Sequence, residues 1–232
     1  MQANLRAVHE RITKAALAAG RGPGEIRLLA VSKAFPAGAI IDAANAGQRA
    51  FGENYVQEAL QKMAEVQREA PDLALEWHFI GPIQSNKTRA IAELFDWVQS
   101  VDRLKIAERL SEQRPDTLLP LNVLLQVNVS GEASKSGVVP EAAAALAVAV
   151  ERLPRLRLRG LMAIPEPEPD RVRQRVPLAR MKQLFDQLRS DDRPLDTLSL
   201  GMSADLEAAI AAGSTMVRIG TAIFGERERH HA

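Results

Sequence analysis

The sequence predicts an α/β protein built as a single (β/α)8 barrel, with one extra helix at the amino terminus. Short apolar segments alternate with amphipathic helical patterns along the whole chain, and about eight such units follow the first helix. Strands that alternate with helices pair in parallel, and eight units in 232 residues fit a slightly short barrel. A doubly wound sheet is the alternative. No G-x-G-x-x-G fingerprint follows the first strand, which disfavours its dinucleotide-binding form.

The first elements are an amphipathic helix and a buried strand. Residues 4–19 place apolar side chains at helical spacing, so residues 1–24 are interpreted as a helix and a linker. Residues 27–36, RLLAVSKAFP, contain a nearly uninterrupted apolar run, which is typical of a strand covered on both faces. Pro36 suits the first turn of the next helix, and Gly47 suits its end.

Seven further units follow the same pattern. The expected strands are short apolar runs bounded by polar turns, at residues 49–53, 75–81, 96–102, 121–129, 156–164, 197–203 and 214–220. The expected helices carry an apolar face, at residues 54–66, 88–95, 103–112, 141–153, 178–188 and 204–213, with a short turn at 221–225. Residues 165–177 are rich in proline and charge and predict a loop, either a mobile lid or rim of the barrel or, preferably, a plain solvent-exposed loop. Residues 226–232 are expected to form a polar tail, and residues 1–232 one domain.

The composition excludes several classes of function. The formal net charge of +1 gives no basic excess of the kind that nucleic-acid binding requires. The absence of cysteine removes disulfides, thiolate nucleophiles and thiolate metal ligands, and the four histidines suggest no metal cluster. No apolar run is long enough to span a bilayer, and the first residues do not form a signal-peptide core. We therefore expect a cytoplasmic protein without a membrane partner.

Lys33 is the candidate nucleophile. In an extended strand, Leu29, Val31 and Lys33 share one face, so the lysine points where its neighbours are apolar. Desolvation lowers the pKa of a lysine until the neutral, nucleophilic amine becomes accessible, which is the chemistry of a Schiff-base lysine. A lysine that extends into solvent from the end of a strand is an equally good interpretation of this stretch alone.

The last unit suggests an anion site. Arg218 and Gly220 share one face of the last strand, and in a closed barrel this strand pairs with the first, which brings Arg218 beside Lys33. Gly220 and Thr221 supply backbone amides at the start of a short helix, where barrels usually bind phosphate, and Ser203 adds a hydroxyl. This combination describes a phosphorylated aldehyde bound as an aldimine.

Three of the polar residues also have purely structural interpretations. Asn54, with Gln57 three residues later, matches a capping box, and Ser203 is well placed as a helix N-cap. His78 fits a hydrogen-bonded core histidine as well as a site residue, and it is left unassigned.

Six long motifs occur along the chain: AVSK at 30–33, FGENYVQE at 51–58, WHFIGPIQSNK at 77–87, VNVSGEASKSG at 127–137, GLMAIP at 160–165 and LGMSADLEAAIAAGSTMVRIGTAIFG at 200–225. In this order they resemble the YggS/PROSC family of pyridoxal phosphate homeostasis proteins. The resemblance implies a fold-type III barrel like the amino-terminal domain of alanine racemase, with pyridoxal 5'-phosphate as cofactor. It assigns Lys33 to the covalent link, Arg218 to the pyridine nitrogen, Ser203, Gly220 and Thr221 to the phosphate, and Asn54 to the pocket wall.

An arginine at the pyridine nitrogen disfavours its protonation and weakens the ring as an electron sink. Racemases that resemble this chain compensate with a tyrosine base and a second domain, whereas this chain has one tyrosine, Tyr55, expected on a helix. We therefore expect a monomeric, non-catalytic protein that stores, buffers or delivers pyridoxal phosphate, in part through transient contact with apo-enzymes. The alternatives are a racemase-like enzyme that uses pyridoxal phosphate and a cofactor-free Schiff-base lyase that uses Lys33.

Overall fold

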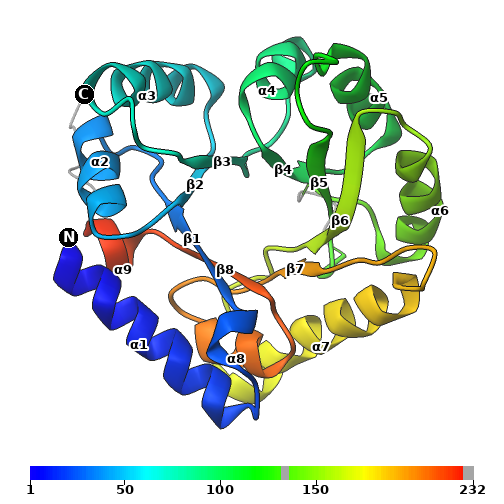
Figure 1. Ribbon diagram of the computed structural model, residues 1–232. Helices are drawn as coiled ribbons and strands as arrows, with labels where there is room; N and C mark the ends of the chain where they lie inside the picture. Colours follow the sequence, from blue (N-terminus) through cyan, green and yellow to red (C-terminus); the bar gives the residue numbers. More distant parts are fainter. Residues whose placement is uncertain (132–135, 227–232) are drawn as a thin grey trace, which may run out of the picture.

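The protein is a closed barrel of eight parallel strands, in the order β1-β2-β3-β4-β5-β6-β7-β8, in a computed structural model that describes residues 1–131 and 136–226. The strands are β1 (Arg27–Val31), β2 (Ala50–Glu53), β3 (Glu76–Phe79), β4 (Trp97–Val101), β5 (Leu121–Gln126), β6 (Leu156–Met162), β7 (Thr197–Ser199) and β8 (Met216–Ile219). Figure 1 shows them at the centre of the molecule, with the helices around them. The predicted (β/α)8 fold is confirmed. Residues 227–232 of the expected tail lie outside the described residues, as do residues 132–135 of the fourth motif.

The helices of the described ranges form the outer layer. They are α1 (Gln2–Ala18), α2 (Ala37–Asn45), α3 (Val56–Glu69), α4 (Thr88–Leu94), α5 (Leu104–Gln113), α6 (Pro140–Glu151), α7 (Arg171–Leu188), α8 (Leu206–Ala211) and α9 (Thr221–Phe224), with 3-10 turns η1 (Pro23–Glu25) and η2 (Ser85–Lys87). The extra helix α1 buries Leu5, Val8 and Ile12 and packs against α8 and α9 (Figure 1). Because the apolar residues of α1 recur at helical spacing, they share one face of the helix, and this face is turned toward the barrel.

The barrel closes where β1 pairs with β8, with Leu29 opposite Arg218. Leu29, Ala50 and Met216 form a small interior cluster, while Leu28 belongs to a cluster that includes α1 and α2. Successive side chains of β1 thus point alternately into the barrel and toward the helices, and both sides are buried. This burial explains why β1 reads as a continuous apolar run.

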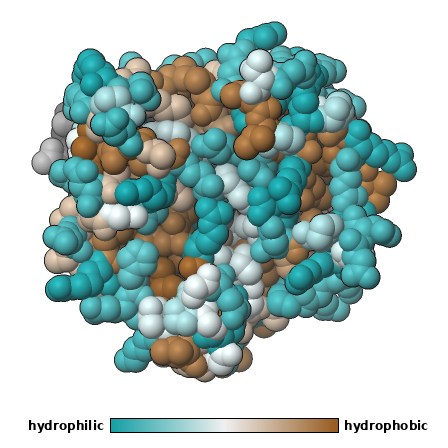
Figure 2. Space-filling view, in the orientation of Figure 1, coloured by the Kyte–Doolittle hydropathy of each residue, from teal (hydrophilic) through white to brown (hydrophobic). Residues whose placement is uncertain are grey.

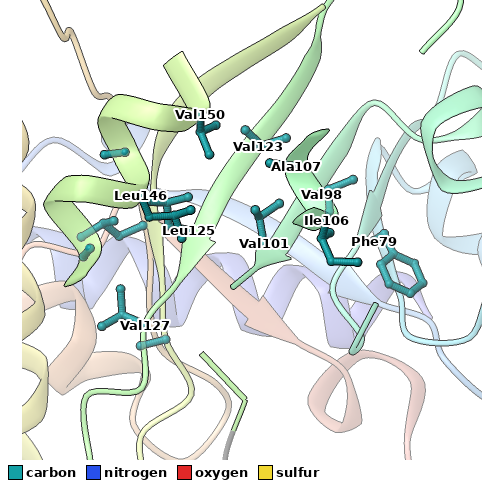
Figure 3. Packing of buried hydrophobic residues seen from close by; sticks show 14 of the residues in the cluster. Phe79, Val98, Val101, Ile106, Ala107, Val123, Leu125, Val127, Leu146 and Val150 are labelled. Atoms are coloured by element: carbon teal, nitrogen blue, oxygen red, sulfur yellow. The ribbon is translucent and has the colours of Figure 1, made fainter. Parts of the chain in front are cut away.

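The outer face of the sheet is packed tightly against the helices. Figure 3 shows Val98 of β4 and Val123 of β5 among side chains such as Ile106 of α5 and Val150 of α6. These four residues are fully buried in the largest apolar cluster of the described chain. Truncating one such large aliphatic side chain to alanine typically costs about 2–5 kcal/mol, so this layer fixes the strands that carry the site.

One prediction about the helices is wrong. Residues 171–177 are not part of the expected loop, because α7 begins at Arg171 and the loop is restricted to residues 163–170. The side chain of Asp170 accepts hydrogen bonds from the backbone N–H groups of Val172 at 2.8 Å and Arg173 at 3.0 Å, which is a typical N-cap. Pro177 lies inside the helix. The cap and the helix propensity of the residues after it stabilise the helix by more than the proline destabilises it.

The surface of the protein is mixed. Figure 2 shows one face of the molecule as largely hydrophilic, with hydrophobic residues gathered in separate patches. Within the described ranges, no helix combines the length and the apolarity that a membrane crossing requires.

Candidate functional site

A pocket of about 320 Å³ lies where the carboxyl ends of the strands meet. This end of the barrel carries the active sites of (β/α)8 enzymes. All six residues that the sequence singled out line this pocket: Lys33, Asn54, Ser203, Arg218, Gly220 and Thr221. The remaining lining is mainly apolar and comes from Val31, Phe35, Ile80, Ile164, Met202 and Ala204. Among the described residues of the lining, Lys33 and Arg218 carry the ionisable groups.

Arg218 forms part of the barrel wall and is only 4% exposed. Its Nη1 donates to the carbonyl oxygen of Ser199 at 2.8 Å and to the Ser199 hydroxyl at 2.7 Å, and its Nη2 donates to the carbonyl oxygen of Ala163 at 2.8 Å. Burial lowers the pKa of Arg218 to about 10, partly offset by the charge of Asp205. The guanidinium is therefore a fixed cation at neutral pH.

Lys33 lies in the turn after β1, two residues beyond the end of the strand. It is half-buried and lines the same pocket as Val31, as the alternation along the chain predicts. Phe35 in the same turn stacks on Phe224 of α9, with ring centroids 5.0 Å apart. The lysine thus stands between the first and last units of the barrel.

A buried ion cluster holds the backbone on one side of Lys33. The ammonium of Lys62, on α3, lies 2.9 Å and 3.1 Å from the two carboxylate oxygens of Glu53 and donates to the carbonyl oxygen of Ser32 at 2.8 Å. The Ser32 hydroxyl donates to Glu53 at 2.6 Å. Burial raises the pKa of Glu53, although Lys62 and Ser32 act in the opposite direction. The cluster ties β1, β2 and α3 together directly before the lysine.

The other side of Lys33 is held by Glu58. Ala34 has a positive φ of 65°, a left-handed conformation that is uncommon outside glycine. Its backbone N–H donates to the carboxylate of Glu58, which also pairs with Lys62. Sequence reasoning missed this cluster. Its one signal was the spacing of four residues between Glu58 and Lys62, which is equally typical of a solvated helical pair.

Small residues and hydroxyl groups line the wall near β8. A Cβ atom on Gly220 would lie 3.1 Å from the carbonyl oxygen of Val31, so glycine allows close approach of the two strands. Helix α8 begins after Asp205 and not after Ser203. The N-cap interpretation of Ser203 is therefore wrong. Ser203 and Thr221 both place hydroxyl-bearing side chains along the pocket.

Asn54 is not a helix cap either. The residue at the N-cap of α3 is Tyr55, and the side chain of Asn54 makes no capping hydrogen bond there. The Oδ1 atom of Asn54 is buried and has no hydrogen-bond partner among the described residues. Buried acceptors are normally satisfied, so this atom marks a place where a ligand would donate a hydrogen bond. Gly81 packs directly on the Asn54 backbone, because a Cβ at Gly81 would overlap the Asn54 carbonyl group.

His78 lies away from this pocket, in the interior of the barrel. It is fully buried, its ring stacks on Trp97 at a centroid distance of 5.2 Å, and both ring nitrogens have partners. The structure therefore agrees with the interpretation of a hydrogen-bonded core histidine.

Comparison with known proteins agrees with this architecture. The family model for the alanine racemase N-terminal domain matches residues 3–228. The pyridoxal phosphate homeostasis protein of Pseudomonas aeruginosa is 64% identical over 225 residues, which cover 97% of this chain and 95% of the relative. PipY of Synechococcus elongatus, whose structure has pyridoxal phosphate bound, is 36% identical with a TM-score of 0.78, covering 92% of this chain and 100% of PipY.

An alanine racemase from Clostridium difficile shares the fold at 15% identity, with a TM-score of 0.74 over 96% of this chain and 56% of the racemase. The fold and the position of the pocket thus define a barrel of the alanine racemase N-terminal type. Within that class, the chain belongs to the family of pyridoxal phosphate homeostasis proteins.

Proposed function

We propose that this protein binds pyridoxal 5'-phosphate through Lys33 and takes part in the homeostasis of that cofactor as a carrier. The observation that carries the proposal is the meeting of all six expected residues in one pocket at the carboxyl end of the barrel. The relatives named for pyridoxal phosphate homeostasis and the PipY structure with the cofactor bound support the same ligand.

The chemistry of the pocket fits this group. Pyridoxal phosphate supplies an aldehyde that condenses with a primary amine and releases one water molecule. Lys33 supplies the amine, Arg218 supplies a fixed donor for the ring nitrogen, and Asn54 supplies an acceptor that has no partner within the described ranges. Ser203, Thr221 and the backbone at Gly220 supply donors for the phosphate, and the apolar lining accommodates the ring.

We further propose that the protein does not turn over a substrate. A buried guanidinium keeps a positive charge beside the ring nitrogen, which disfavours protonation of the nitrogen and weakens the ring as an electron sink. Tyr55, the one tyrosine of the sequence, is 60% exposed and is not among the residues that line the pocket. Lys33 is therefore the one residue in the described lining that is suited to general acid–base chemistry at neutral pH.

Residues from six strand ends of a single chain contribute to the lining of the pocket. We propose a monomer that releases the cofactor to apo-enzymes by transient contact at the mouth of the barrel. Light scattering across a range of concentrations tests the monomer. The rate at which an apo-enzyme gains activity, compared between the loaded protein and an equal amount of free cofactor, tests the transfer.

Absorption spectra test the proposed function. Adding pyridoxal phosphate to the wild type should produce the absorption band of the lysine-bound cofactor, and Lys33→Ala should abolish it. Borohydride reduction followed by peptide mass mapping should place the cofactor on Lys33. A wild type that remains colourless favours the cofactor-free lyase, and racemisation of an amino acid beyond the stoichiometry of the protein favours the enzyme.

A further inference from the structure

A chain of buried hydrogen bonds crosses the interior of the barrel and ends at Arg218. The Ser199 hydroxyl, which accepts from Arg218, lies 2.7 Å from Oε1 of Gln99 on β4. The Nε2 atom of Gln99 lies 2.9 Å from Nδ1 of His78 on β3. The Nε2 atom of His78 lies 2.6 Å from the carboxylate of Glu76, at the start of β3. The chain thus connects the proposed cofactor pocket with the amino end of the barrel.

Every hydrogen bond in this chain has the same direction. Because the Ser199 oxygen accepts from Arg218, its proton is available for Oε1 of Gln99. The amide nitrogen of Gln99 then donates to Nδ1 of His78, which leaves the proton of a neutral ring on Nε2, facing Glu76. Burial lowers the pKa of His78, although Glu76 opposes this effect, which is consistent with a neutral ring. Donation therefore runs from a guanidinium at one end to a carboxylate at the other.

This hydrogen-bond network supports Arg218 through the Ser199 hydroxyl, beside the two backbone carbonyl oxygens that the guanidinium also contacts. Gln99, Ser199 and His78 are each 0% exposed, and the Nε2 atom of Gln99 also donates to the sulfur of Met216 at 3.1 Å. At the far end, Glu76 also accepts from Arg27 at 2.6 Å. Hydrogen bonds in such a chain polarise one another, and a buried polar group that loses its partner is costly. An amide does not pass a proton along, so the chain transmits orientation and polarity rather than protons.

We propose that Gln99, His78 and Glu76 are positioning residues that hold the Arg218 guanidinium in a fixed orientation toward the ring nitrogen of the bound cofactor. The inference deepens the proposed function and rests on it. These residues do not line the pocket, and they act through Ser199. The barrel interior would thereby set the affinity and the absorption spectrum of a cofactor that it does not touch.

Gln99→Met breaks the chain in its middle and keeps an unbranched side chain of similar length. We expect the dissociation constant for pyridoxal phosphate to rise about three- to tenfold, as for the loss of one hydrogen bond, with a shifted absorption maximum for the bound cofactor. Gln48→Met is the matched control. Gln48 is 5% exposed and donates two hydrogen bonds to backbone carbonyl groups that do not belong to the hydrogen-bond series from Arg218 to Glu76. The control should leave affinity and spectrum within twofold of the wild type.

Two variants at His78 separate the hydrogen bonds from packing. His78→Gln can accept from Gln99 and donate to Glu76, so it should keep the wild-type affinity and spectrum. His78→Leu fills the space without either hydrogen bond and should behave like Gln99→Met. The proposal is overturned if Gln99→Met and His78→Leu both keep the wild-type spectrum and affinity, or if His78→Gln behaves like His78→Leu. The His78 pair decides the question by itself if Gln99→Met does not fold.

A measurement without the cofactor distinguishes failure of this inference from failure of the proposed function. A guanidinium held at both Nη atoms rotates slowly, so Arg218 should give separate, slowly exchanging Nη–H signals in the NMR spectrum of the unloaded wild type. Gln99→Met should broaden or merge them. If the wild type gives separate signals but never takes up pyridoxal phosphate, the assignment of the cofactor is refuted and the positioning role of Gln99 is retained. Signals unchanged by Gln99→Met would refute the positioning role.

Discussion

Replacing Lys62 by methionine tests whether the buried ion cluster beside Lys33 determines the stability of this part of the barrel. Methionine is unbranched and apolar, so Lys62→Met keeps much of the side-chain volume and removes the ammonium. The carboxylate of Glu53 is 0% exposed and loses the cation that lies 2.9 Å away. The carbonyl oxygen of Ser32 loses a donor at 2.8 Å in the same change.

The structure sets the size and the pH dependence of this effect. Removing one partner of a buried ion pair costs about 3–5 kcal/mol, because the other charge remains uncompensated, and we expect this loss in the free energy of unfolding at pH 7. Burial already raises the pKa of Glu53 above its ordinary value of 4.5, and the loss of Lys62 raises it further. The folded state then binds more protons than the unfolded state. The penalty at Glu53 should therefore be absent below about pH 4.5 and grow as the pH rises through the raised pKa.

Urea unfolding followed by circular dichroism at pH 5 and pH 7 measures both effects. Lys182→Met is the matched control, because Lys182 also pairs with a carboxylate four residues away, but their side chains are 39% and 53% exposed. This control should lose less than about 1 kcal/mol. The double variant Lys62→Met/Glu53→Gln removes both charges of the Glu53–Lys62 pair and should recover most of the loss. A loss below about 1 kcal/mol in Lys62→Met, or no recovery in the double variant, refutes the reasoning.

Two further predictions concern the wall of the pocket and the amino end of the barrel. In Gly81→Ala, the new Cβ overlaps the Asn54 carbonyl group, so we expect a loss of about 1–3 kcal/mol on urea unfolding and weaker binding of pyridoxal phosphate; unchanged binding would contradict the placement of Asn54. Burial would raise the pKa of Glu76, but the hydrogen bond from His78 and the charge of Arg27 lower it below its ordinary value of 4.5. The ionised carboxylate therefore stabilises the fold above about pH 4.5, and this contribution is lost as the pH falls through the lowered pKa. Glu76→Gln should flatten the dependence of unfolding free energy on pH across that range, and an unchanged slope would count against the shift.

The barrel could be predicted from the sequence because its strands are buried on both faces. Continuous apolar runs such as that of β1 are rare outside parallel sheets, and closure then brings Arg218 beside the first strand. The residues at which the strands end could be predicted less accurately than the barrel itself. The strand expected at residues 197–203 extends four residues beyond Ser199, where β7 ends. Met202 and Ser203 belong instead to the loop that lines the pocket, and local periodicity does not distinguish such a loop from the end of a strand.

The two buried polar networks could not be predicted, because their members come from different elements. From its sequence pattern, Lys62 is expected on the exposed face of an amphipathic helix. In the folded protein it is buried, because α3 packs where Glu53 of β2 lies beside it. Gln99 and Ser199 lie 100 residues apart in the sequence and meet across the interior of the barrel. A polar residue in an apolar strand was a signal in both cases, but its partner is determined by tertiary packing.

The two cations of the pocket are supported in different ways, and the difference suits a carrier. Arg218 is a wall residue with two hydrogen bonds to Ser199 of β7 and one to the carbonyl oxygen of Ala163, directly after β6, so its orientation is set close to the strands. Lys33 projects from a turn whose backbone is anchored on both sides, at Ser32 and at Ala34. In the proposed function, uptake and release of the cofactor would make and break a bond at the Lys33 amine, whereas the ring nitrogen would need a donor that does not move. The bond that changes would then be carried by a long side chain on an anchored turn, and the proposal places the exchange at that turn rather than in the barrel wall.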